Sequence, residues 1–309
     1  MLCHFLEEDN LDILIWIILV LIASVIWISV FDSNRFTVSH YEFTDARIRK
    51  PVKVVFLSDL HCKMFGYGGT FLIEKIKEIN PDLILMGGDM ITAYPGHKED
   101  NTVNFIKALY ELFPIVYAFG NHELRLKIYP EEYGDTWKRY TEKLGKFGLG
   151  ITENGKWELE GSGVDIISFS AERKYYKRFE KMTMEPAYIR ETAGEADPAK
   201  FSILLAHNPE YFGAYSEYGA DLTLSGHVHG GIMRIPFPAM GKNSSGSKIV
   251  MRGVISPGLK LFPKYDSGRF DRNGKSMIIS RGLGTHTIPV RIFNPGDLVV
   301  IDLKPENGV

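Results

Sequence analysis

The stretch Val52-Lys-Val-Val-Phe-Leu-Ser-Asp-Leu-His61 organises the whole chain. Its first six residues are mostly apolar and β-branched, which predicts a buried strand. The strand stops at a carboxylate and an imidazole, Asp59 and His61. Ligands of open α/β sheets bind just beyond the carboxyl ends of strands, and both side chains are of metal-binding types. Alone, such a pair is more often a helix N-cap followed by a surface histidine. A metal-binding interpretation therefore depends on whether similar strand endings recur along the chain.

Length and composition allow a sizeable core. The chain has 309 residues, of which 45% are hydrophobic, enough for one large domain or two small ones. The net charge is -2, so we expect no nucleic-acid partner attracted by bulk charge. Of the two cysteines, Cys3 precedes an apolar segment and Cys62 lies beside the expected site. We therefore expect no disulfide between them.

Residues 13–31 are almost wholly apolar and lie between Asp12 and Asp32. That length suits a transmembrane helix, and Trp16 and Trp27 would lie near the two membrane interfaces. A buried core helix and a cleaved signal peptide are the alternatives. The signal peptide fits poorly, because no Lys or Arg precedes the segment and no small-x-small cleavage site follows it. We expect an uncleaved single-span anchor in the cell membrane.

Basic residues follow the apolar segment and none precede it. The positive-inside rule then favours a cytoplasmic location for the domain that follows, although a large domain can override this bias and the extracytoplasmic face stays open. The expected organisation is a tail (1–12), the anchor (13–31), a connector (32–50) with one possible strand at 36–43, and one large domain (51–309).

Strand endings like that of the opening stretch recur along the chain. Predicted helices at 70–79 and 103–112 separate the next two apolar runs, which indicates a largely parallel sheet with right-handed crossovers. The apolar runs with their polar endings are 83–86 before Gly87-Gly88-Asp89, 115–119 before Gly120-Asn121-His122-Glu123, 201–206 before His207, and 221–225 before Gly226-His227-Val228-His229. A last strand is expected at 298–303. Five strand endings thus gather two carboxylates, one amide and five imidazoles, which is enough for two metal ions with one carboxylate bridging them.

The segment between these runs, 124–200, reads as less regular. It contains a basic and aromatic stretch, Arg173-Lys-Tyr-Tyr-Lys-Arg-Phe179. A solvated helix face is the favoured interpretation of this stretch, with a lid or a membrane-facing surface as the alternative.

Taken in order, the motifs resemble the signature of the calcineurin-like metallophosphoesterase superfamily. They are Asp59-x-His61, Gly88-Asp89, Gly120-Asn121-His122-Glu123, His207 and Gly226-His227-x-His229, and the match spans Val52 to about Leu303. The sequence around these motifs is similar to that of the YkuE/YaeI-type branch, for example at His207-Asn-Pro-Glu210 and Gly282-Leu-Gly-Thr285. This branch commonly carries an N-terminal membrane segment. The resemblance implies a four-layer α/β/β/α sandwich of two mixed sheets. We expect the second sheet to come from strands after His207.

The resemblance also implies roles for individual residues. One ion would be held by Asp59, His61 and His229, the other by Asn121, His207 and His227, with Asp89 as the bridge. His122 would be catalytic, either protonating the leaving oxygen or stabilising developing charge. Glu123 is equally well a support for the ligands or a plain surface carboxylate, and His286 is expected to be inert. The ligand types suit Mn, Fe or Zn about equally.

The function that these roles imply is a membrane-anchored, dinuclear-metal phosphoesterase. It would hydrolyse a phosphate ester or pyrophosphate by attack of a metal-bound hydroxide. Its substrate would be lipid-linked if the anchor reflects the substrate's location, and relatives of this branch include enzymes that cleave UDP-2,3-diacylglucosamine. The alternatives are a metal-stabilised binding or sensor protein without catalysis, and a nuclease.

Overall fold

The structure is a computed structural model that describes residues 2–177, 182–235, 253–255, 261–285 and 289–306. The end of the basic and aromatic stretch, Arg178 and Phe179, and the loop residue His286 lie outside the described residues.

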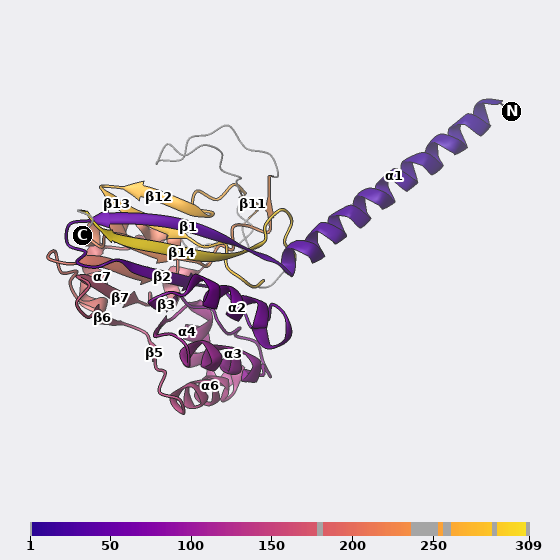
Figure 1. Cartoon of the computed structure of the whole chain (residues 1–309). Coiled ribbons are helices and arrows are strands. Elements are labelled where there is room, and N and C mark those ends of the chain that lie inside the picture. The colour runs from indigo at the N-terminus through magenta and orange to yellow at the C-terminus, as the bar shows by residue number, and fades with distance from the viewer. Residues whose placement is uncertain (1, 178–181, 236–252, 256–260, 286–288, 307–309) are drawn as a thin grey trace.

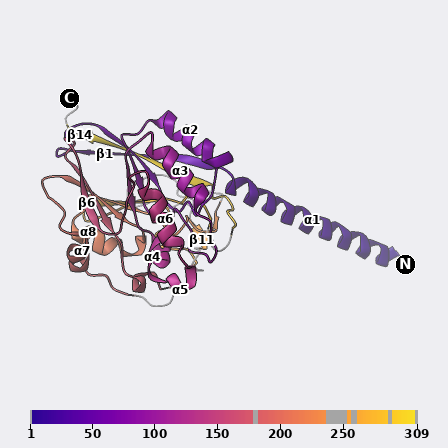
Figure 2. The ribbon, with the colours of Figure 1, turned by 90° about the horizontal axis from the view of Figure 1, so that it is seen from below.

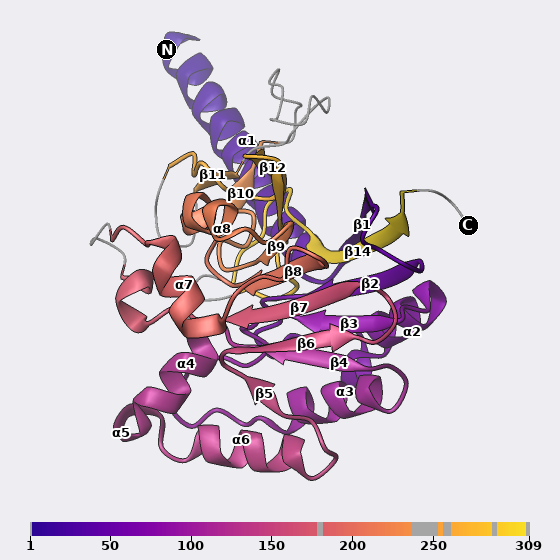
Figure 3. The same cartoon turned by 90° about the vertical axis from the view of Figure 1, so that its left-hand side faces the viewer.

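Two six-stranded sheets form the centre of the domain (Figures 1 and 3). The first sheet has the order β1 (Phe36–Asp45), β14 (Gly296–Pro305), β2 (Val52–Leu57), β3 (Leu83–Met86), β4 (Ile115–Ala118) and β5 (Ile151–Thr152). The second has the order β12 (Gly268–Arg272), β13 (Lys275–Ile279), β9 (Leu222–Ser225), β8 (Phe201–Ala206), β7 (Val164–Phe169) and β6 (Gly155–Leu159). Both sheets are mixed, because β14 runs antiparallel to β2, and the edge strands β6 and β12 run antiparallel to their neighbours.

Helices cover the outer face of each sheet. The longer helices are α1 (Leu2–Ser33), α2 (Thr70–Ile79), α3 (Asp100–Tyr110), α4 (Asn121–Ile128), α6 (Thr136–Gly145), α7 (Pro186–Ala193) and α8 (Phe212–Tyr218). The short elements are α5 (Pro130–Tyr133), η1 (Tyr67–Gly69), η2 (Arg173–Tyr176), η3 (Pro209–Tyr211) and a two-stranded ribbon of β10 (Met233–Arg234) and β11 (Gly253–Ile255). The order of layers is therefore helix, sheet, sheet, helix, as the resemblance implied.

The alternation of side chains along β2 shows how the layers are held together. Val55 and Leu57 pack into the cluster beneath α2, α3 and α6. Val54 and Phe56 point the other way, into the cluster between the two sheets. Side chains alternate faces along a strand, so a strand that packs against a core on each face needs apolar residues at consecutive positions. This double burial explains why the sequence of β2 is an almost continuous apolar run.

The second sheet differs from the prediction. Only β9, β12 and β13 follow His207, whereas β6, β7 and β8 precede it and β14 belongs to the first sheet. The strand β7 is buried along its whole length, but Asp165 interrupts its apolar run. That carboxylate is fully buried and bridged to Lys156 at 2.7 Å and Lys200 at 3.2 Å. Paired lysines from β6 and from the residue before β8 make the buried charge tolerable, and a single sequence does not reveal them.

The segment 124–200 is more regular than expected, since it contributes four helices and three strands. The possible strand at 36–43 is confirmed and extended: β1 pairs in parallel with β14 over ten residues, so most of the predicted connector is part of the first sheet. The apolar segment at 13–31 is helical, and the helix α1 also includes residues 2–12 of the predicted tail. Beyond its last turn, where the Asp32 side chain is buried, α1 projects away from the domain (Figure 2).

We predict that Ile301→Ala lowers the free energy of unfolding by about 3 kcal/mol, because truncating a fully buried side chain removes apolar contact and leaves a cavity. Ile301 lies at the centre of β14 in the cluster between the sheets and has no exposed surface. Chemical denaturation of the full chain in detergent measures the change. The control is Leu112→Ala at a side chain 48% exposed, and an equal loss in both variants would contradict the assignment of the core.

Candidate metal centre

Two buried carboxylates lie at the carboxyl ends of β2 and β3. Asp59 has no exposed surface and Asp89 is 2% exposed. The Asp59 carboxylate accepts hydrogen bonds from the Ser58 hydroxyl at 2.6 Å and from the His227 backbone N–H at 3.0 Å. Asp89 Oδ1 accepts the backbone N–H of His122 at 2.8 Å. These contacts leave one oxygen of Asp89, Oδ2, directed at a group of histidines.

Six of the seven predicted ligands are brought together. Asp59, His61 and His229 offer ligand atoms within 4.8 Å of one another, as do Asp89, His207 and His227. The two groups adjoin, because Asp89 Oδ2 lies 3.8 Å from His61 Nε2 and 3.1 Å from His207 Nε2. Asp89 is thus placed between the groups, where a bridging ligand would be.

The orientation of the rings suits cations. His229 Nδ1 can only donate to the Gly284 carbonyl, 3.3 Å away, and His207 Nδ1 to the Gly87 carbonyl, 2.8 Å away. In a neutral ring this leaves the lone pair on Nε2, as for metal-binding histidines whose other nitrogen is held by a hydrogen bond. His61 Nε2 and His229 Nε2 approach to 3.2 Å, a contact that a shared cation would stabilise.

The seventh predicted ligand, Asn121, begins α4 beside this cluster. Its Oδ1 is buried and has no hydrogen-bond partner among the described residues. A buried amide oxygen without a partner destabilises the fold, and a cation would satisfy it. His207 Nε2 is buried in the same way, facing the Asp89 carboxylate without hydrogen-bond geometry. The residues present therefore fit a pair of divalent ions.

Charge at the centre is unbalanced without cations. Burial raises the pKa of Asp59 to about 6, against the opposing attraction of His207. Burial lowers the pKa of His207, but the Asp89 and Asp59 carboxylates outweigh it and raise that pKa to about 10. A proton on His207 thus compensates the carboxylates where an ion would otherwise do so.

The backbone at the site is held in a rare conformation. Five predicted ligands have a positive φ, which few residues other than glycine adopt: Asp59 (52°), His61 (47°), Asp89 (54°), His227 (69°) and His229 (52°). Such angles cost free energy and cluster at functional sites. Gly88 has a φ of 92°, and a Cβ there would lie 2.1 Å from the Gly120 nitrogen. The loops after β3 and β4 can approach this closely only with glycine.

His122 lies in the same cluster with a fixed tautomer. Its Nδ1 accepts the backbone N–H of Ala93 at 2.7 Å, and its Nε2 lies 4.0 Å from Asp89 Oδ2. Because a backbone N–H can only donate, the neutral ring carries its proton on Nε2. His122 therefore presents an N–H donor toward the space beside Asp89. Its backbone N–H also orients Asp89.

Glu123 is a support for the ligands, and the surface-carboxylate alternative is wrong. The side chain is fully buried. One oxygen accepts the N–H groups of Asp89 at 2.8 Å and Gly120 at 2.9 Å, and the other accepts Met90 N–H at 2.9 Å and the Tyr117 hydroxyl at 2.7 Å. Burial and the Asp89 carboxylate raise the pKa of Glu123 to about 7. A Glu at the third helical position after a strand is a capping signature and is the signal that could have identified it.

Sequence reasoning missed the neighbour of His227. In the basic and aromatic stretch, the Tyr176 ring packs edge-on against His227 with centroids 5.4 Å apart. Tyr175 is buried and stacks on Tyr188 at 5.2 Å. The interpretation as a solvated helix face is therefore wrong for Tyr175 and Tyr176, whereas Arg173 and Lys174 are half-buried and Lys177 is exposed.

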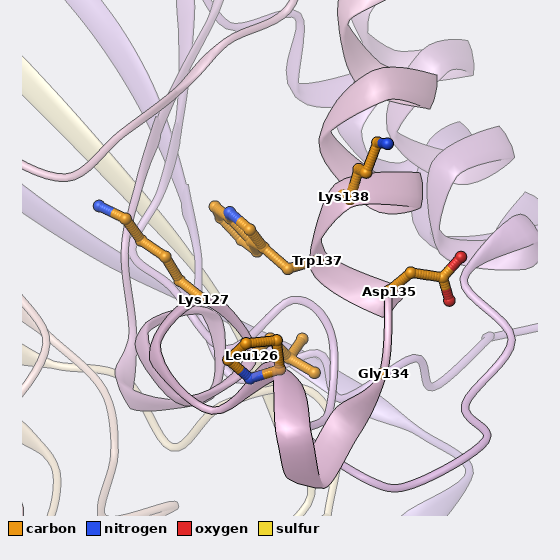
Figure 4. A pocket seen from close by; sticks show the side chains of 7 residues that line it. Leu126, Lys127, Gly134, Asp135, Trp137 and Lys138 are labelled. Atoms are coloured by element: carbon orange, nitrogen blue, oxygen red, sulfur yellow. The ribbon is translucent and has the colours of Figure 1, made fainter.

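A shallow pocket of about 340 Å³ lies elsewhere, among α4, α5 and α6 (Figure 4). It is lined by Leu126, Lys127, Pro130, Gly134, Asp135, Trp137 and Lys138. No predicted ligand lines it within the described chain, so it takes no part in the metal centre.

Comparison with known proteins identifies a family and several relatives. A family model described as calcineurin-like phosphoesterase matches residues 52–231, a range that contains every predicted ligand. The uncharacterized metallophosphoesterase YkuE of Bacillus subtilis (strain 168) is 26% identical over 268 residues, which are 82% of this chain and 80% of YkuE. An uncharacterized metallophosphoesterase of Helicobacter pylori (strain J99) is 24% identical over 84% of this chain, which spans 62% of that protein. The phosphodiesterase YaeI of Escherichia coli (strain K12) is 29% identical over 60% of this chain and 63% of its own.

We predict that Glu123→Gln weakens metal binding about tenfold to a hundredfold, as removal of a ligand's hydrogen-bonded support typically does. An amide cannot accept on both sides, so one pair of donors loses its acceptor. Calorimetric titration of the metal-free protein with Mn²⁺ measures the change. The matched control is Glu131→Gln on the exposed face of α5, and equal affinities in the two variants would refute the role of Glu123.

Proposed function

Because the chain belongs to the calcineurin-like phosphoesterase family, we propose that it is a metal-dependent phosphoesterase anchored in a membrane. The observation that carries the proposal is the pair of adjoining His and Asp groups that meet at Asp89. Beside them lies the buried, unpartnered oxygen of Asn121 within the described chain. The substrate would be a phosphate ester or a pyrophosphate.

The proposed roles follow the two groups. Asp59, His61 and His229 would hold one ion, Asn121, His207 and His227 the other, and Asp89 would contact both. When bound, two such ions supply Lewis-acid activation of water and of the phosphate oxygens. The protein's own part is to hold seven ligands in place through backbone N–H groups, the Glu123 carboxylate and the carbonyls behind the histidines. The family is generally dependent on two metals, and Mn, Fe and Zn all suit this donor set.

For His122, the contact geometry favours one of the two roles considered. Protonating a leaving oxygen efficiently would need a second ring proton on Nδ1, where His122 instead accepts the Ala93 N–H. The Nε2–H group faces the space beside Asp89, where it would donate to a phosphate oxygen and stabilise charge that develops there. We therefore assign His122 as a hydrogen-bond donor to the reacting phosphate.

The proposal of an anchor rests on α1. The most apolar 18-residue window of Leu11–Ser33 has a mean hydropathy of 3.0, and none of that window is buried in the domain. A signal sequence would have the same length and composition, so the uncleaved span is part of the proposal. We keep the cytoplasmic placement from the charge bias as the working orientation. A lipid-linked substrate such as UDP-2,3-diacylglucosamine belongs in the substrate panel.

We predict that Asp89→Ala abolishes hydrolysis of an aryl phosphate in Mn²⁺ and lowers the metal content per chain, because the shared ligand is lost. Elemental analysis and a chromogenic assay measure the two effects, and chelation followed by reloading with Mn, Fe or Zn identifies the active metal. Unchanged hydrolysis in the variant would count against a dinuclear mechanism. Failure of the metal-loaded wild type to turn over any ester would favour the binding or sensor alternative.

We predict that His122→Ala lowers kcat about a hundredfold to a thousandfold, as removal of one preorganised donor does, while the metal content stays at the wild-type value. Steady-state kinetics and elemental analysis on the same preparation separate the two effects. Loss of metal in parallel with activity would show that His122 supports the ligands and does not act on the substrate.

A further inference from the structure

The junction between α1 and the domain is short and braced. Only Asn34 and Arg35 separate the helix from β1, a reach of roughly 10 Å at full extension. The buried carboxylate of Asp32 accepts the Arg35 guanidinium at 2.7 Å and the Asn294 backbone N–H at 3.0 Å. Lys63 donates to the Asn34 side chain at 2.7 Å. The domain therefore begins directly at the end of the apolar helix.

The metal centre lies at this same end of the domain. β1 starts beside α1, β14 runs parallel to β1, and β2 runs antiparallel to β14, so the carboxyl end of β2 points back toward α1. Asp59 follows that end. A second path agrees, because Asn294, bound to Asp32 through its backbone, also donates its side-chain amide to the His229 carbonyl at 2.8 Å.

Large apolar side chains are exposed at this end. The loop after the His61 ligand packs Phe65 against Phe36 of β1, with ring centroids 5.1 Å apart. Two residues farther on, Tyr67 is 96% exposed, and Phe71 at the start of α2 is 66% exposed. β11 lies near the base of α1 as well (Figures 1 and 2), and Leu261, bridged to it, is 68% exposed.

We propose that this end of the domain rests on the bilayer through Tyr67 and Phe71, so that the metal centre receives its phosphate-ester substrate at the membrane surface. The proposal deepens the proposed function and rests on its membrane anchor. Lipid is the occupant of this surface in the proposal, because a span that ends at Ser33 puts lipid headgroups within reach of the adjoining loops. Aromatic side chains favour that interface, and Lys63 adds a positive charge that anionic headgroups attract.

The first test measures contact with lipid and needs no activity. Phe71→Cys and Leu112→Cys are each made in a Cys3→Ser background, labelled with an environment-sensitive fluorophore, and placed in nanodiscs of phosphatidylcholine and phosphatidylglycerol. The unsubstituted background serves as the blank for Cys62. Leu112 is the matched control, because it is exposed and precedes the amino end of β4, the opposite end of the parallel strands. Nitroxide-bearing lipids should quench the label at 71 severalfold more than the label at 112, and equal quenching would overturn the proposal.

The second test asks whether the surface serves catalysis. The substrates are an aryl phosphate carrying a long acyl chain, embedded in the nanodiscs, and its chain-free parent in solution. The double variant Tyr67→Ser, Phe71→Ser should lower the ratio of acylated to parent hydrolysis severalfold, whereas Leu112→Ser should leave the ratio unchanged. An unchanged ratio in the double variant would refute delivery from the membrane. If wild-type protein hydrolyses neither ester, the phosphoesterase proposal fails, while the quenching experiment still decides the docking.

Discussion

Two carboxylates buried within a few ångströms of the same histidines destabilise a fold unless positive charge compensates them. Asp59 and Asp89 are in this position, and much of the domain serves to tolerate it. Each carboxylate accepts backbone N–H groups from another loop, and His207 has a raised pKa because of them. Divalent cations beside these carboxylates would supply the same compensation.

The same constraint explains the loops around the centre. The left-handed backbone at Asp59, His61 and Asp89 turns each side chain inward immediately after its strand, where a regular strand or helix would direct it elsewhere. The buried Glu123 then ties the Asp89 loop to the start of α4 with three backbone hydrogen bonds. Strain at the ligands is thus accompanied by satisfied hydrogen bonds just behind them.

Much of this could be predicted from the sequence, because buried parallel strands appear as short apolar runs and their polar endings stand out against them. The candidate ligands were identified in this way. The strands of the second sheet were not predicted correctly, because the paired charge of Asp165 interrupts the apolar run of β7. The burial of Glu123 and the packing of Tyr176 on His227 depend on segments distant in sequence. The amino-acid sequence alone does not show which distant segments come into contact.

The claim on which the account depends is that two cations share the Asp89 carboxylate. Anomalous diffraction from crystals of the full chain grown with Mn²⁺ tests it most directly. The account predicts two peaks roughly 3.5–4 Å apart, as in other two-metal sites, with Asp89 touching both and Asn121 touching the one beside His207. A single peak, or peaks bound by other residues, would contradict it.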